Sequence, residues 1–224
     1  MAGGILAYTS VVAEATWFPP GDPARFDPVA GLGTIQSYAG AGVRLLGFEA
    51  RFVRDDGTLD LTATYRPGPT VEYRFARSLP GPPNDPPPLG TGRRADDQWY
   101  EPITVKVSKP WEFRSVSRSS GGTRSRYQYF NLGMTRAAGR PQAGPQLAFA
   151  AAPSCALRDF WKAAADRGAP LGAVAVIRYD PTGYIFQIQG TKVLLAFGAD
   201  CAPLSEFPRN SPFKPGLSGL SQGP

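Results

Sequence analysis

The sequence contains no histidine, and this absence excludes several classes of enzyme. Hydrolases that activate a serine or cysteine through a histidine base cannot be built, nor can zinc sites with imidazole ligands. The side chain most often used for proton transfer near neutral pH is also missing. Any acid–base chemistry would therefore depend on carboxylates.

The carboxylates lie in predicted turns and linkers, at Asp55-Asp56, Asp96-Asp97 and Asp180. An aspartate in a turn usually caps its own backbone, so these residues are weak catalytic candidates. No glycine-rich phosphate loop is present, and the turn at residues 55–60 lacks the spacing of a calcium loop. We therefore predict a non-enzymatic protein with no catalytic residue, no metal and no cofactor.

Only two cysteines occur, Cys155 and Cys201, which are too few for a four-thiolate metal site. Cys155 begins the last predicted helix and Cys201 follows the last predicted strand. They are either a disulfide, which would stabilise the second half of the chain, or two separate buried thiols. The one enzymatic alternative is a reactive thiol at Cys155, at a helix N-terminus.

No run of apolar residues approaches the roughly 20 needed to span a bilayer, so we expect no transmembrane segment. The N-terminus lacks the basic start of a secretory signal. We expect a cytoplasmic location if Met1 is the native start. An extracytoplasmic location is expected if the cysteines are bonded and a signal or anchor was removed.

The clearest positive signal lies in residues 173–201. Three alternating apolar runs are separated by turn residues at 180–183 and 190–191. This pattern predicts a three-stranded antiparallel meander. Residues 155–166 precede it and predict a helix, whose apolar stripe at helical spacing consists of Leu157, Phe160, Trp161 and Ala164.

The first half of the chain predicts the same order of elements. A short helix is expected from Asp27 or Pro28 to Gly40, followed by strands at 44–53, 59–65 and 70–77. We therefore predict an α+β fold of antiparallel sheets with a duplicated α-β-β-β unit and one short helix per repeat. Two unrelated meanders are the alternative.

This interpretation divides the chain into five segments, which follow from shifts in composition. The 26 glycines and 24 prolines among 224 residues indicate many turns and connectors. The segments are a first unit with an N-terminal strand (1–78), a proline-rich linker (79–98), a basic hairpin region with a connector (99–146), a second unit (147–206) and an extended tail (207–224).

Residues 106–140 form the most basic part of the chain, with eight Lys or Arg residues and one acid, Glu112. The whole chain has a formal net charge of +6, so the remainder is close to neutral. The candidate contact residues for an anionic partner are Arg114, Arg118, Arg124 and Arg126. Strand alternation places Trp111 and Phe113 opposite Arg114, which predicts one basic and one aromatic face.

Two interpretations of this hairpin remain open. Its aromatic face is either buried in the core beneath a solvated arginine face, or the hairpin makes an electrostatic contact with another molecule. Separate faces argue against base stacking, because nucleic-acid readers usually combine aromatic and arginine side chains on one face.

We therefore predict a binding or assembly module, a subunit that contacts a larger protein partner. The basic hairpin, the proline-rich linker and the tail would be its contact elements. The alternative function is a basic protein that binds nucleic acid or an anionic surface through residues 106–140. The partner's identity and the oligomeric state stay open.

The second half of the chain carries a pattern of separate positions: Cys155, Leu157, Trp161, Gly168-Ala169-Pro170, Tyr184 and Asp200-Cys201. With this pattern, residues 154–201 resemble an uncharacterised C-terminal module of membrane-tethered and kinase-linked proteins from predatory soil bacteria. Residues 48–75 are similar to the first half of the same proteins. The resemblance implies the architecture and a bonded cysteine pair, and it assigns no catalytic residue.

Overall fold

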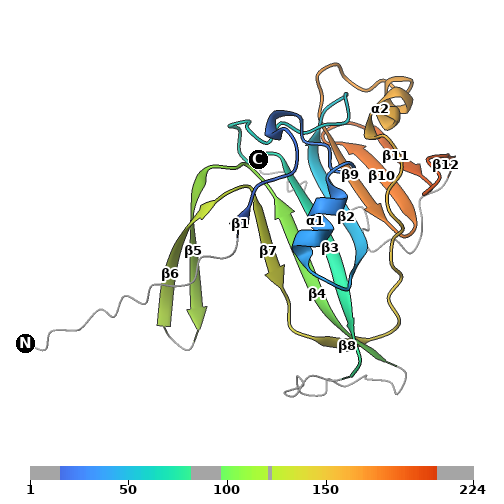
Figure 1. Cartoon of the computed structure of the whole chain (residues 1–224). Helices are drawn as coiled ribbons and strands as arrows, with labels where there is room; N and C mark the ends of the chain where they lie inside the picture. Colours follow the sequence, from blue (N-terminus) through green and yellow to red (C-terminus); the bar gives the residue numbers. More distant parts are fainter. Residues whose placement is uncertain (1–15, 82–96, 121–122, 206–224) are drawn as a thin grey trace, which may run out of the picture.

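The computed structural model describes residues 16–81, 97–120 and 123–205, without the side chains of the hairpin residues 115–128. The predicted tail, most of the proline-rich linker and the start of the N-terminal strand lie outside the described residues. Within them, the chain is mostly antiparallel sheet with two short α-helices (Figure 1).

Ten of the described strands form one sheet in which every pair is antiparallel. Its order is β1 (Thr16–Trp17), β7 (Met134–Ala138), β4 (Gln98–Val107), β3 (Thr70–Leu79), β2 (Val43–Val53), β9 (Ala175–Asp180), β10 (Gly183–Ile188), β11 (Leu194–Phe197) and β12 (Pro203–Leu204). The short β8 (Gln142–Gly144) pairs with β4 beside this path. A separate two-stranded sheet consists of β5 (Glu112–Ser120) and β6 (Thr123–Asn131).

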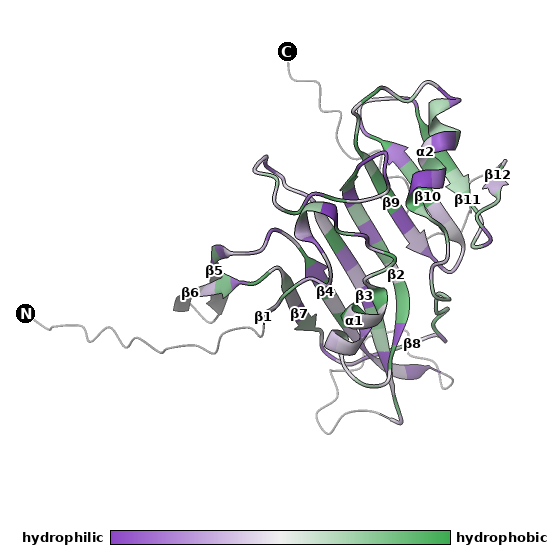
Figure 2. Cartoon of the chain, turned by 45° about the horizontal axis from the view of Figure 1, so that its top comes forward, coloured by the Kyte–Doolittle hydropathy of each residue, from purple (hydrophilic) through white to green (hydrophobic). Residues whose placement is uncertain are grey.

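Two helices pack on one face of the large sheet: α1 (Leu32–Ala39) and α2 (Leu157–Ala165). A 3₁₀ helix, η1 (Pro23–Arg25), precedes α1. Both α-helices contribute to a single hydrophobic cluster with the inward side chains of the strands. In β3 and β4, buried residues that face the helices alternate with more exposed ones, and Figure 2 shows hydrophobic and hydrophilic residues along the strands. The strands β10 and β11 are apolar on both faces, because Ile185 and Ala196 are buried as well.

The helix and the three-stranded meander predicted for the second half of the chain are both observed. The strands β9, β10 and β11 form the expected meander, and all four stripe residues of α2 are buried. The Trp161 ring meets Phe186 edge-on with centroids 5.1 Å apart, and Phe160 stacks on Phe197 at 4.3 Å. The helical stripe and the alternating strands therefore meet in one aromatic contact layer.

The first helix begins later than predicted. The Asp27 carboxylate does accept hydrogen bonds from the backbone N–H groups of Val29 and Ala30, as a helix cap would. These bonds close a turn, however, and the α-helix starts only at Leu32. It ends as predicted at Gly40, whose φ of 117° other residues rarely adopt.

The predicted strand at residues 59–65 is wrong. Both edges of β2 are occupied, by β3 and β9, so this segment has no partner there. Leu59 instead forms an isolated bridge with Phe26, and Asp60 accepts hydrogen bonds from Thr62 that turn the chain. The alternation did identify buried positions, because Leu59 and Leu61 are both fully buried.

The first unit therefore has two strands after its helix and the second has three, so the duplication is not confirmed. The predicted connector after the hairpin is also partly wrong, because residues 134–138 and 142–144 are β7 and β8. These two strands pair with β4, which joins the middle of the chain to the same sheet as both units.

Candidate interaction surface at the hairpin base

The hairpin of β5 and β6 extends away from the large sheet (Figure 1). Its base is held by Asn131, a buried side chain at the end of β6. The Asn131 amide Nδ2 donates to Ser108 Oγ at 3.1 Å and to the Lys109 carbonyl at 3.3 Å, and its Oδ1 accepts from the Gly133 N–H at 2.9 Å. Both connections between the hairpin and the sheet are therefore fixed to one side chain.

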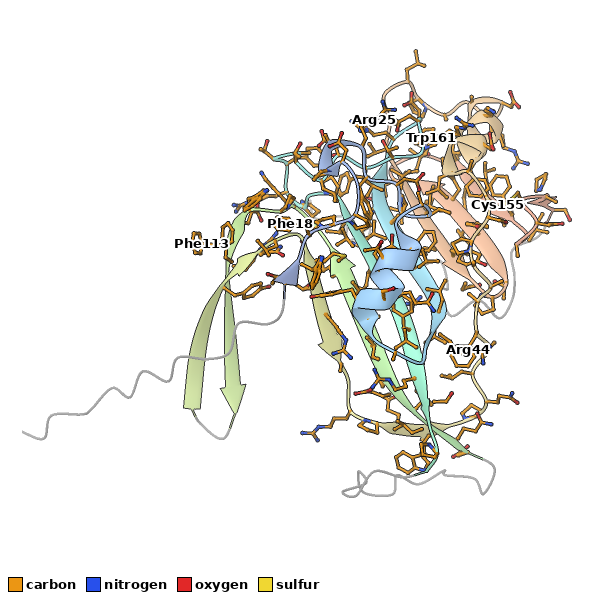
Figure 3. The ribbon with its side chains drawn as sticks, viewed as in Figure 1. Phe18, Arg25, Arg44, Phe113, Cys155 and Trp161 are labelled. Carbon is orange, nitrogen blue, oxygen red and sulfur yellow. A yellow bond between two sulfur atoms is a disulfide. The ribbon has the colours of Figure 1, made fainter. Side chains whose placement is uncertain are left out.

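Four aromatic rings form a continuous surface at this base, which we call the aromatic patch: Phe18, Trp111, Phe113 and Phe130. Trp111 lies 4.9 Å from Phe18 and 5.8 Å from Phe130, and Phe113 lies 5.0 Å from Phe130, measured between ring centroids. Phe113 is 82% exposed and Trp111 is 63% exposed. Figure 3 shows Phe18 and Phe113 beside the hairpin, far from Trp161 and Cys155.

This arrangement contradicts one of the two interpretations left open by the sequence, in which Trp111 and Phe113 are buried in the core. Trp111 and Phe113 do not enter the core, because the hairpin forms a sheet of its own. The predicted separation of faces also fails at the base, where the register places Arg114 opposite Tyr129 and Phe113 opposite Phe130. Arg114 therefore shares its face of the hairpin with a tyrosine.

A groove of about 1080 Å³ adjoins the patch, between the loop at residues 63–69 and the hairpin base. Trp111 and Phe113 belong to its wall, and Lys106 and Arg51 reach it from β4 and β2. Lys106 stands between Val105 and Val107, which are buried in the core. Because neighbouring side chains on a strand point to opposite faces, the groove lies on the face that the helices do not cover.

Most of the charged residues that line this groove are cations. It is lined by Arg51, Arg66, Lys106, Lys109 and Arg114, with Glu112 as the one acid. The Glu112 carboxylate is 2.6 Å from the Arg114 guanidinium and 3.9 Å from the Lys109 ammonium. Arg66 and Lys106 are exposed and form no ion pair with any described residue.

Arg51 is connected to an ion-pair group beside the groove. The Glu49 carboxylate accepts hydrogen bonds from Arg51 and, at 2.8 Å, from Arg178 on the neighbouring strand. Burial would raise the pKa of Glu49, but the hydrogen bonds and charges of the two arginines outweigh it and lower this pKa. Glu49 therefore holds Arg51 at the edge of the groove.

Of the four arginines predicted as contacts, Arg114 lines the groove. Arg118, Arg124 and Arg126 lie farther along the hairpin, in register with Ser125, Ser119 and Ser117. Their side chains lie outside the described residues, so their contact role stays a prediction.

Sequence reasoning did not single out Phe18, Arg51 or Arg66 as part of this surface. Phe18 follows β1, which pairs with β7, and the Thr16 hydroxyl donates to the Phe130 carbonyl. Arg66 lies between the strands predicted at 59–65 and 70–77, and nothing local indicated that this connection faces the hairpin. Long-range pairing brings these residues together.

The cysteine pair is a disulfide between Cys155, two residues before the start of α2, and Cys201, in the turn before β12. Of the two alternatives, the bond is thus the one observed, and no free thiol is present. A bonded sulfur is not a nucleophile, so the reactive-thiol alternative at Cys155 has no support in this structure.

The described residues lack two features, a metal-binding cluster and a membrane-spanning helix. They contain no group of three or more acidic, cysteine or histidine side chains placed to hold a metal ion. Among the same residues, no helix combines the length and apolar character needed to cross a membrane.

Comparison with protein-family models, with curated protein sequences and with solved structures gives no match to this chain. The resemblance to the C-terminal module of predatory soil bacteria stays a prediction. The geometry of the hairpin base is therefore the feature that indicates a function.

Proposed function

We propose that this chain is a non-enzymatic binding module that contacts a partner protein through the aromatic patch. The observation that carries the proposal is the exposure of Phe113 and Trp111 within a continuous group of four rings. Large exposed apolar surfaces are uncommon on soluble monomers and usually mark interaction sites. Aromatic and arginine side chains are also enriched where proteins bind each other.

Hydrogen bonds and strand pairing hold the segments that carry the patch. Asn131 fixes both connections of the hairpin, and β1 fixes the segment that carries Phe18. A partner would order few additional side chains on this surface, which reduces the entropic cost of association. This support also distinguishes the patch from scattered exposed residues such as Leu171.

The test compares two variants of the full chain as bait in native lysate. The double variant Trp111→Ser/Phe113→Ser changes two exposed residues of the patch. Leu171→Ser changes an exposed apolar residue in the loop after α2 and is the matched control. Bound proteins are eluted by a salt gradient and identified by mass spectrometry.

We expect a stoichiometric protein that is retained by the wild type and by Leu171→Ser, and lost by the double variant. Retention by all three baits would contradict the proposal. Thermal melting of each bait before use ensures that lost binding is not lost folding.

A further inference from the structure

We infer that the groove beside the aromatic patch receives an acidic, extended segment of the partner, which places a bulky apolar side chain against Trp111 and Phe113. This inference depends on the proposed function and adds the chemistry of the partner. It is based on the charge of the groove, on its internal carboxylate contact and on the rings of its wall.

The charge of the groove favours an anionic occupant. Five cations and one acid line it, and the chain as a whole is positively charged, at +6. Cations gathered in one hollow repel each other, and an anionic ligand relieves that repulsion while being attracted from a distance. A second copy of this chain would instead bring more positive charge to the site.

The groove already contains one contact between a carboxylate and its basic side chains. Glu112 places its carboxylate between Arg114 and Lys109. Arg66 and Lys106 line the same groove, are exposed, and form no ion pair with another described residue, although Glu72 lies opposite Lys106 in the strand register. They are the positions left for acidic side chains of a partner.

The aromatic wall favours a polypeptide over a nucleic acid. Single-stranded nucleic acids bind where aromatic side chains offer their faces to successive bases. Here the rings contact each other at interplanar angles of 51–57°, so each ring covers part of its neighbour. Such a group offers an uneven apolar surface, which suits a leucine-like or aromatic side chain. Because Trp111 and Phe113 also line the groove, charged and apolar contacts can be made by one segment.

The probe is a short fluorescent peptide of glutamates interrupted by leucines, titrated with the full chain and followed by anisotropy. A peptide with lysines in place of the glutamates and a labelled oligothymidylate of similar length are measured beside it. The test variant is Arg66→Glu/Lys106→Glu. Its matched control, Arg158→Glu/Arg167→Glu, changes two exposed residues at α2 and shifts the net charge equally.

We expect the acidic peptide to bind, with affinity reduced about tenfold or more by Arg66→Glu/Lys106→Glu and less than about twofold by the control. The lysine peptide should not bind. Equal weakening by both variants would show binding to overall charge alone and would overturn the inference. No binding of the acidic peptide, or tighter groove-dependent binding of the oligothymidylate, would overturn it as well.

The two experiments distinguish failure of the inference from failure of the proposed function. If the acidic peptide does not bind while the patch-dependent partner is still captured, the acidic segment is wrong and the protein-binding function stands. If no captured protein depends on Trp111 and Phe113, the proposed function fails, and the inference about its partner fails with it.

Discussion

Asn131 and Ser108 are joined by a buried hydrogen bond across the base of the hairpin, with Nδ2 donating to Oγ at 3.1 Å. Asn131→Ala would remove this bond and leave the Lys109 carbonyl and the Gly133 N–H without their partner. We expect a loss of about 1–3 kcal/mol in the free energy of unfolding, measured by denaturant titration. Ser108→Ala should cost less, because Asn131 keeps its two backbone contacts. If both variants lost the same free energy of unfolding, the two backbone contacts of Asn131 would contribute nothing to stability.

Trp161 is the second expected point of sensitivity. The residue is 7% exposed, and its ring meets Phe186 edge-on. Trp161→Ala should lower the free energy of unfolding by about 3–5 kcal/mol, because it leaves a cavity between α2 and β10. Lys162→Ala, at a neighbouring exposed position, is the control and should be nearly neutral. A near-zero change at Trp161 would mean that the helix packs through other residues.

Gly47 stands at the bulge of β2, where any side chain would collide with the neighbouring strand. A Cβ there would come close to the Tyr179 carbonyl oxygen, and the residue has a φ of 152°. Gly47→Ala should therefore cost about 3 kcal/mol or more. Gly168→Ala meets open space at a φ of 78° and should cost about 1–2 kcal/mol for the backbone alone. The difference in the free energy of unfolding between Gly47→Ala and Gly168→Ala, measured by denaturant melts, reports the collision with Tyr179. Similar losses in the two variants would contradict the collision.

Glu49 should make stability depend on pH in the acid range. Because its folded pKa is lowered from the ordinary 4.5, it contributes stability above that value and loses it as the pH falls through the folded pKa. Glu49→Gln should lower the free energy of unfolding at pH 7 by about 1–3 kcal/mol, since two arginines lose a charged acceptor. The difference in the free energy of unfolding between the variant and the wild type should become smaller below pH 4.5. Denaturant titration at each pH measures this difference. A difference that does not change with pH would contradict the lowered pKa of Glu49 as its source.

The disulfide should contribute to stability through the 46-residue separation that it closes. Replacing Cys155 and Cys201 by alanine should cost about 3–4 kcal/mol. Titration of the native chain with a thiol reagent should detect no free thiol before reduction and two after reduction under denaturing conditions. Reactive thiols in the unreduced chain would contradict the bond.

Local patterns predicted the elements whose partners are near in sequence. The meander of β9, β10 and β11 and the stripe of α2 follow from periodicity alone, because each strand pairs with the next. The strand expected at 59–65 failed because β2 pairs instead with β9, whose sequence lies more than a hundred residues later. No local pattern in the sequence could show that this edge of β2 is paired with β9.

The candidate site was predicted only in part, for the same reason. The sequence identified the basic hairpin and its aromatic residues, and Arg114 lines the groove. It placed Trp111 and Phe113 in the core under one interpretation, because alternation alone does not show whether a hairpin joins the main sheet. Arg66 comes to the groove from a distant loop, which strand periodicity does not report.

The pairing of β2 with β9 has a consequence for synthesis of the chain. Glu49 meets Arg178 across 129 residues, so β2 has an open edge until β9 has left the ribosome. Folding that waits for such distant contacts is slow, and an uncovered strand edge can pair with other chains in the meantime. The nascent protein is therefore most prone to aggregation in this interval, and factors that shield the β2 edge should raise its folded yield.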